Sequence, residues 1–189
     1  MMMKQSLGAK TVLCPLPVLV VGSFDENDRP NVMTASWGGI CCSEPPCAAV
    51  SVRKDRHTFA GIVKHEAFTI SVPSADQVRE ADYVGIYSGR DEDKFADPGL
   101  TAVNSGLVHA PYVDEFPLVL ECALRHTIEL GVHTQFIGEI LDAKVDADVL
   151  DKHGRLDVEK LRPFVYAAGE GGYWAVDHCI GRSYTIGKK

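Results

Sequence analysis

Residues 29–58 hold the side chains of this chain that are best suited to binding a ligand. The stretch reads RPNVMTASWGGICCSEPPCAAVSVRKDRHT and places hydroxyl, amide, indole, guanidinium, ammonium and imidazole groups near the ends of expected strands. Cations with hydroxyl donors favour an anion, and an indole beside them favours a flat ring. We therefore expect an anionic ligand that carries a flat, partly polar ring at one end.

The anion would bind where an expected strand passes into an expected helix. Arg53 and Lys54 end the strand, Asp55 is the expected N-cap, and His57 and Thr58 fall in the first helical turn. Exposed N–H groups at a helix start attract an anion. Arg binds phosphate oxygens bidentately, whereas Lys acts as a point charge. The alternative for this hexapeptide is a solvated, charged turn.

A second cation, Lys94 in the segment SGRDEDKF, could converge on the same phosphate. The alternative is a surface salt bridge with Asp91 or Asp93. His133 falls at an expected turn between two strands, where it could donate a hydrogen bond to a ring carbonyl or lie exposed.

The segment NVMTASW could contact the ring. Asn31, Thr34 and Ser36 occupy near-alternating positions, and Trp37 follows. Alternation places Thr34 and Ser36 on one face of a strand, so both could bond a ring edge while Trp37 covers it. The alternatives are a polar strand face turned to water and a Trp37 packed in the core.

The expected elements are mainly strands with short turns. Three early strands should form an antiparallel meander, two helices flank a further strand, a strand pair joins at residues 131–133, and a helical turn precedes a last strand near Tyr173. Their ranges are 11–24, 31–42 and 47–53 for the meander, 55–66 and 74–89 for the helices, 67–73 for the strand between them, and 118–130 with 134–146 for the pair. Because strands and helices do not alternate regularly, we predict a mainly β fold with added helices (α+β), a barrel or sandwich, in a single domain over residues 1–189.

Composition narrows the class of function. The 189 residues carry a net charge of −7, which disfavours nucleic acid and anionic lipid as partners. The N-terminus has no long apolar segment typical of a signal peptide, and no stretch is apolar enough for a membrane helix, so a cytoplasmic location is expected. The six cysteines have no CxxC spacing and mostly sit in apolar runs as small hydrophobes. No dinucleotide, P-loop, zinc-protease or hydrolase motif occurs, and we expect no metal site.

Six motifs in a fixed order resemble the flavin reductase-like family, whose FMN-binding domain is a split β-barrel. In this chain they read PLPVLVV, RPNVMTASW, EPP, VSVRKDRHT, SGRDEDKF and HTQFIGEI, and the resemblance covers roughly residues 10–185. It implies a homodimer that holds one non-covalent FMN per subunit near the interface. Arg53, Lys54 and Lys94 would then offset the charge of the FMN phosphate.

The resemblance also implies a set of cofactor-binding residues and no catalytic residue. These residues are Asn31, Thr34, Ser36 and Trp37 on the side of the isoalloxazine ring, Ser51, Val52, Arg53 and Lys54 along the ribityl chain and phosphate, His57, Thr58, Ser88 and Lys94 at the phosphate corner, His133 facing the flavin, and Tyr166 packing on the ring from the partner chain.

Three functions fit such a cofactor. The one we favour is an electron-transfer protein that passes electrons between redox partners through FMN. The alternative is an enzyme, an NAD(P)H-dependent flavin (FMN) reductase, in which nicotinamide stacks directly on the flavin and needs no separate dinucleotide motif. A flavin-binding scaffold or sensor comes third.

Overall fold

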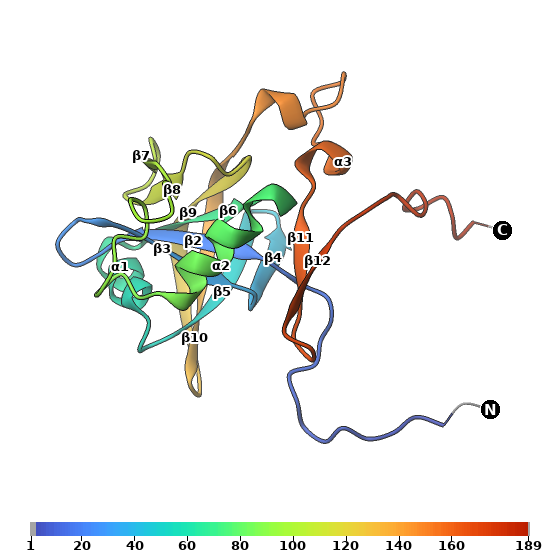
Figure 1. Cartoon of the computed structure of the whole chain (residues 1–189), viewed down its shortest axis with the longest axis horizontal. Helices are drawn as coiled ribbons and strands as arrows, with labels where there is room; N and C mark the ends of the chain where they lie inside the picture. The colour runs from blue at the N-terminus through green and yellow to red at the C-terminus, as the bar shows by residue number, and fades with distance from the viewer. Residues whose placement is uncertain (1–2, 189) are drawn as a thin grey trace.

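An antiparallel sheet of seven strands dominates the structure, a computed structural model that describes residues 3–188 (Figure 1). In the order of their hydrogen bonding, the strands are β3 (Pro30–Ala35), β2 (Leu19–Phe24), β6 (Ala67–Val72), β9 (Leu118–Leu130), β10 (His133–Val145), β5 (Pro46–Arg53) and β4 (Gly38–Ser43). The predicted mainly β fold with added helices is confirmed.

Strands β3 and β4 lie at opposite ends of this order, yet only two residues separate them in the chain. The sheet must therefore curl until its two ends approach, which makes it a barrel. Ser36 and Trp37 form the short crossing, and the Trp37 carbonyl oxygen accepts a hydrogen bond of 2.8 Å from the Ser51 amide on β5. The barrel is thus split at the end of β3, the strand that we expect to contact a ring.

Strand β2 is buried on both faces, which explains why its sequence, LVVGSF, is mostly apolar without alternation. Leu19 and Val21 point into the barrel, where Phe68 and Phe136 fill the core. Val20 points outward into a second cluster with residues of helix α2 and of the loops that cover the barrel. This shared strand supports our prediction of one domain, which remains a prediction.

Two helices cover the outside of the barrel, α1 (His57–His65) and α2 (Val78–Ile86), while α3 (Val158–Leu161) is a single turn. Helix α1 lies so close to β2 that a Cβ on Gly61 would come within 1.9 Å of the Phe24 carbonyl oxygen. Helix α2 lies on β3, where a Cβ on Gly85 would be 3.1 Å from Thr34 Cβ. Both glycines therefore permit the close approach that positions the helix ends.

Short strands complete the structure beside the barrel. They are β1 (Leu16–Pro17), β11 (Phe164–Ala167) and β12 (Gly172–Ala175) in one sheet, and β7 (Ala102–Asn104) with β8 (Pro111–Val113) in another. Figure 1 shows β11 and β12 standing beside the barrel, with both terminal segments reaching away from it. No helix within residues 3–188 has the length and apolar character needed to cross a bilayer.

Several expected elements are confirmed. Helices α1 and α2 fall within the predicted ranges, and β9 and β10 form the predicted pair around Gly131 and Val132. Gln77 accepts a hydrogen bond of 2.9 Å from the Ser74 amide at the predicted start of the second helical segment.

Three expectations are wrong. The first strands form no meander, because the expected strand at 31–42 breaks at Ser36 and Trp37 into β3 and β4. As a result, β2–β3 and β4–β5 are separate hairpins at opposite ends of the sheet order. Asp55 is not the N-cap of α1, since the helix begins two residues later and Arg56 occupies that position. Most cysteines are not buried: Cys47 and Cys122 are, whereas Cys14, Cys41, Cys42 and Cys179 are exposed.

Candidate functional site

A cavity of about 590 Å³ opens at the split of the barrel and is hereafter the main cavity. Strands β3, β5 and β11, the start of β10 and one face of α2 surround it. It brings together half of the predicted binding residues, namely Thr34, Ser36, Trp37, Ser51, Arg53, His133 and Tyr166.

A smaller cavity of about 110 Å³, the corner cavity, lies between the start of α1 and the loop after α2. It is lined by four further predicted residues, His57, Thr58, Ser88 and Lys94. The two cavities share Met33, Arg56 and Gly85, so they form neighbouring compartments of one site. A ligand with a flat ring and a distant anionic group has a place for each part.

The side chain of Lys94 is buried, with 5% of its surface exposed. Its ammonium group donates hydrogen bonds of 2.7 Å to the carbonyl oxygens of Val32 and Val84, near the end of α2. An ammonium group has three donors, so one remains for a ligand. Burial lowers the pKa of Lys94 to about 8, and the positive charge of Arg56 adds to the effect.

Lys94 forms neither of the salt bridges considered as its alternative role. Within residues 3–188 no carboxylate lies at ion-pair distance from its ammonium group. The Asp93 carboxylate instead accepts hydrogen bonds of 3.0 Å from the Phe95 and Ala96 amides. A buried cation without a counter-ion is costly, and an anionic ligand in the corner cavity would neutralise it.

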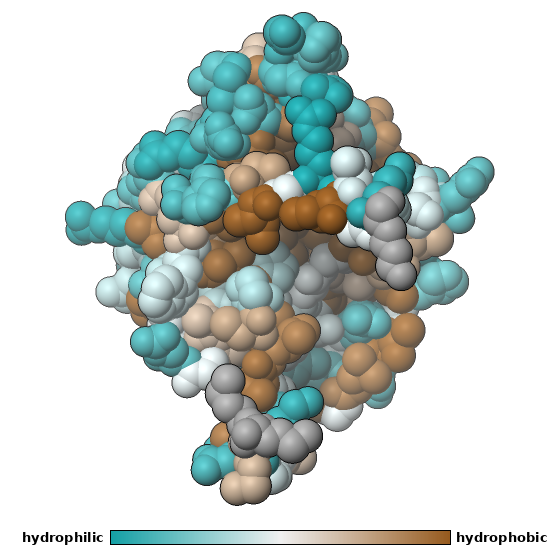
Figure 2. Space-filling model, turned by 90° about the vertical axis from the view of Figure 1, so that its right-hand side faces the viewer, coloured by the Kyte–Doolittle hydropathy of each residue, from teal (hydrophilic) through white to brown (hydrophobic). Residues whose placement is uncertain are grey.

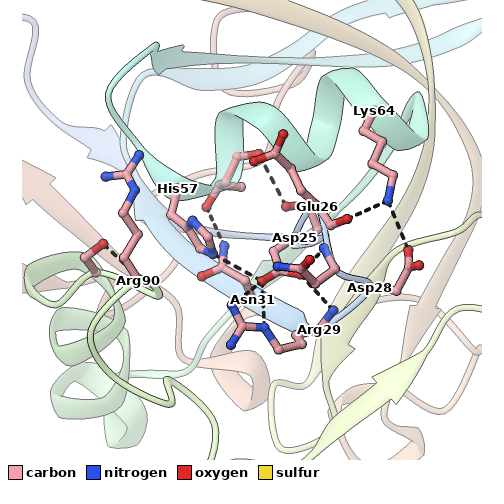
Figure 3. Close-up of polar contacts among 12 residues, drawn as sticks. Asp25, Glu26, Asp28, Arg29, Asn31, His57, Lys64 and Arg90 are labelled. Carbon is pink, nitrogen blue, oxygen red and sulfur yellow. Dashed lines mark hydrogen bonds and ion pairs between the residues drawn. The ribbon is translucent and has the colours of Figure 1, made fainter.

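The start of α1 is held in place by hydrogen bonds from β3 and from the turn before it. Asn31 Nδ2 donates to Thr58 Oγ1 at 2.8 Å, and both side chains are buried. Asp25 Oδ2 lies 3.6 Å from His57 Nε2 and also pairs with Arg29 at 2.8 Å. Figure 3 shows Asp25 between His57 and Arg29. The first residues of α1 and two basic side chains, Arg56 and Lys94, thus line one small cavity, and a helix start beside basic groups favours a phosphate.

Burial raises the pKa of Asp25, but hydrogen bonds from the amides of Arg29 and Asn27 and from the Arg29 guanidinium outweigh burial. The net effect holds the pKa of this carboxyl below its ordinary value. Asp25 therefore stays ionised and can orient His57 at the corner cavity.

Two aromatic rings, Trp37 and His133, form one wall of the main cavity. The rings of Trp37 and His133 lie parallel within 5°, with centroids 6.3 Å apart. On another side, the Tyr173 hydroxyl donates a 2.8 Å hydrogen bond to Asp82 of α2. Hydroxyl groups of Ser36 and Ser51 supply donors and acceptors between these walls. Such a space suits a flat heteroaromatic ring.

Three predicted residues lie outside the linings of both cavities. Val52 is buried in the core, and Lys54 is exposed and pairs with Glu129 at 2.6 Å. Asn31 lies next to the corner cavity, where it donates a hydrogen bond to Thr58 and does not line the main cavity.

One predicted placement differs from the structure, and one stays untested. Arg53 lines the main cavity and pairs with Asp55 at 3.0 Å, so it does not join Lys94, and Arg56 takes that position. Tyr166 lines the main cavity of its own chain on β11, which pairs with β1, and its packing on a ring from a partner chain stays a prediction.

Sequence reasoning missed the contributions of Arg56, of Arg90 and of helix α2. Arg56 and Arg90 stand inside the two motifs already singled out, so their charge was a usable signal. Asp82, Gly85 and Ile86 share one helical face by their spacing. Nothing in the sequence indicates that this face lies over β3.

Residues 11–174 match the flavin reductase like domain, so the chain belongs to the flavin reductase-like family. The structure is similar to flavoredoxin of Desulfovibrio vulgaris (Miyazaki F), at 50% identity and a TM-score of 0.94 over 98% of this chain and 100% of that one. It shares its fold with a putative flavin reductase with a split barrel domain from Shewanella frigidimarina, at 24% identity and a TM-score of 0.80 over 90% and 87% of the two chains.

A third relative is the ferric-chelate reductase (NAD(P)H) of Archaeoglobus fulgidus. It is 32% identical over 135 residues, which cover 70% of this chain and 79% of the relative. Together these similarities confirm the resemblance and the split-barrel fold, and they support a flavin cofactor and flavin-based electron transfer. The two compartments fit such a group, because a flavin mononucleotide joins a tricyclic ring to a phosphate.

Stability of the ligand-free protein should depend on pH through Lys94. Burial lowers its pKa from 10.5 to about 8, so between these values the unfolded chain carries one proton more than the folded chain. The free energy of unfolding should therefore rise as the pH rises through this interval. Urea denaturation at a series of pH values measures it.

Two variants identify the source of the rise. Lys94→Met should remove it, whereas Lys54→Met, whose side chain is exposed and paired with Glu129, should retain it. An equal pH dependence in wild type and Lys94→Met would show that another group is responsible.

Proposed function

We propose that this chain is an FMN-binding electron-transfer protein that passes electrons between redox partners through a non-covalent FMN. The observation that carries the proposal is the buried, uncompensated Lys94 beside Arg56 in the corner cavity, next to a ring-sized main cavity. The 50% identity to a flavoredoxin favours an electron carrier. The net charge of −7 suits docking to a basic redox protein.

Different residues would bind different parts of the cofactor. Lys94, Arg56 and the N–H groups at the start of α1 would hold the phosphate, with the hydroxyl groups of Thr58 and Ser88 completing its hydrogen bonds. Bound FMN would supply reversible uptake and release of electrons. Hydrogen bonds and positive charge at the pyrimidine end of the ring would set the redox potential, and Arg53 is the cation at the main cavity available for this.

The alternative is an NAD(P)H-dependent FMN reductase. Two relatives favour it by their names, the ferric-chelate reductase (NAD(P)H) and a nitrophenol monooxygenase reductase component that is 31% identical over 136 residues. An NAD(P)H:FMN oxidoreductase would bind nicotinamide against the flavin in the main cavity.

We further propose that the chain acts as a homodimer. A cavity of about 490 Å³ beside the main cavity is lined by Leu13, Trp37 and Ile40, whose side chains are 74%, 40% and 68% exposed. Figure 2 shows apolar surface gathered around a hollow on the face that carries both terminal segments. A second copy of the chain would cover this surface.

Disrupting the apolar face should separate the subunits. Ile40→Lys places a charge on this face and should convert a dimer to a monomer in analytical ultracentrifugation. Val63→Lys, at a residue that is 49% exposed on α1, is the matched control and should leave the dimer intact. A monomeric wild type would refute the dimer.

Removing a corner cation should weaken FMN binding through the phosphate. Arg56→Met should cost about 1.5–3 kcal/mol, because it removes a charge-assisted hydrogen bond. Riboflavin lacks the phosphate, so its affinity should change little. Fluorescence titration with both flavins measures the difference, and Lys54→Met, outside both cavities, is the control.

If Arg56→Met weakened FMN and riboflavin equally, the arginine would not act on the phosphate. Unchanged FMN affinity would remove it from the site altogether.

Anaerobic mixing with NADH or NADPH separates the carrier from the reductase. A carrier should keep its oxidised flavin absorbance with stoichiometric pyridine nucleotide and lose it only with a reduced protein partner or dithionite. Rapid bleaching by NADH or NADPH would establish the reductase instead.

A further inference from the structure

Three potential metal ligands meet on the outside of the barrel, away from the linings of the main and corner cavities. Asp28 lies in the turn between β2 and β3, His65 is the last residue of α1, and His109 lies in the loop between β7 and β8. One side-chain ligand atom from each lies within 4.8 Å of the other two. Sequence spacing could not indicate this cluster, because the three residues come from distant segments.

The two distances from the Asp28 carboxylate to the imidazole nitrogens are close to those of a zinc coordination shell. Asp28 Oδ1 lies 3.5 Å from His65 Nε2 and 3.4 Å from His109 Nε2. Zinc bonds to nitrogen and oxygen of about 2.0–2.1 Å, arranged as a tetrahedron, separate neighbouring ligand atoms by about 3.3–3.4 Å. An ion could therefore be accommodated with small side-chain movements.

The two imidazole rings are held in place by packing. His65 and His109 lie edge to face with centroids 4.7 Å apart, and Phe24 packs against the His109 ring at 4.6 Å. The His65 side chain is 6% exposed, whereas those of His109 and Asp28 are 59% and 61% exposed. The cluster thus has a fixed inner ligand and two ligands open to an ion from solvent.

The cluster also contacts a backbone carbonyl oxygen and one lysine. His65 Nε2 lies 3.0 Å from the Asp25 carbonyl oxygen, and Lys64 Nζ is 3.7 Å from Asp28 Oδ1. Lys64 also donates a 2.8 Å hydrogen bond to the Glu26 carbonyl oxygen, as Figure 3 shows, so it has a partner if an ion takes its place at Asp28. The same ring nitrogens can bind either a proton or a metal.

We propose that Asp28, His65 and His109 form a binding site for a divalent transition metal, with water in the remaining position. Imidazole and carboxylate ligands in this geometry match Zn²⁺ best. A bound ion would tie the β2–β3 turn, the end of α1 and the β7–β8 loop together. The site is independent of the flavin proposal, since none of the three residues lines the main or the corner cavity.

Calorimetric titration of the chelator-treated full-length chain with Zn²⁺ tests this proposal. Exposed thiols also bind zinc, so the titrations use a background in which Cys14, Cys41, Cys42 and Cys179 are serine. One equivalent should bind and raise the thermal midpoint. Loss of one ligand should weaken zinc binding by roughly 10–100-fold or more.

The informative variants are His109→Ala and Asp28→Asn, both at exposed side chains, with His153→Ala in an exposed turn as the control. The proposal requires weak binding in the first two and wild-type binding in the control. Absence of stoichiometric binding in the parent, or unchanged affinity in a folded His109→Ala or Asp28→Asn variant, would overturn it.

Discussion

A buried ammonium group without a counter-ion is the constraint on which the site depends. Lys94 gives two of its hydrogen bonds to backbone carbonyls at 2.7 Å, which fix its position between β3 and α2. Its charge meets a second cation, Arg56, rather than a carboxylate. In the ligand-free protein this arrangement costs free energy, and burial accordingly lowers the pKa of the lysine to about 8. An anion of charge close to two reverses the balance, which is why we assign a phosphate to this corner.

The fold brings the main cavity and the corner cavity together through the short segment between β3 and β4. The chain leaves β3 at Ala35 and enters β4 at Gly38, so Ser36 and Trp37 lie at the split of the barrel. The neighbouring strand β5 then ends at Arg53, and α1 begins four residues later. Main-chain geometry alone therefore places a strand edge, an indole and a helix start beside one another. Close packing of α2, permitted by Gly85, closes the remaining side.

Local patterns predicted the parts of this site better than their arrangement. Strand and helix signals predicted β5, α1 and α2, but they joined β3 and β4 into one strand over 31–42. The six motifs indicated the family that the comparisons confirm. The hexapeptide at residues 53–58 was identified as basic, but the sequence does not show which arginine turns toward Lys94. That choice depends on where α1 begins, and Arg56 rather than Asp55 precedes the helix.

Long-range pairing was beyond prediction for a related reason. Turn signals indicate hairpins, and both early hairpins are present, but they say nothing about their positions in the sheet. The predicted meander is wrong because β6, β9 and β10 lie between the two hairpins in the sheet order. The sequence likewise could not predict the burial of Lys94, because a lysine among four acidic neighbours is typical of an exposed loop.

The most direct test of the account is a ³¹P NMR titration of FMN bound to the wild-type protein. A phosphate monoester in water takes up its second proton with a pKa of about 6. If Lys94, Arg56 and the start of α1 hold the dianion, the phosphorus resonance should stay constant from about pH 8 to about pH 5. A resonance that moves with a pKa of about 6 would show a solvent-exposed phosphate and would contradict the account.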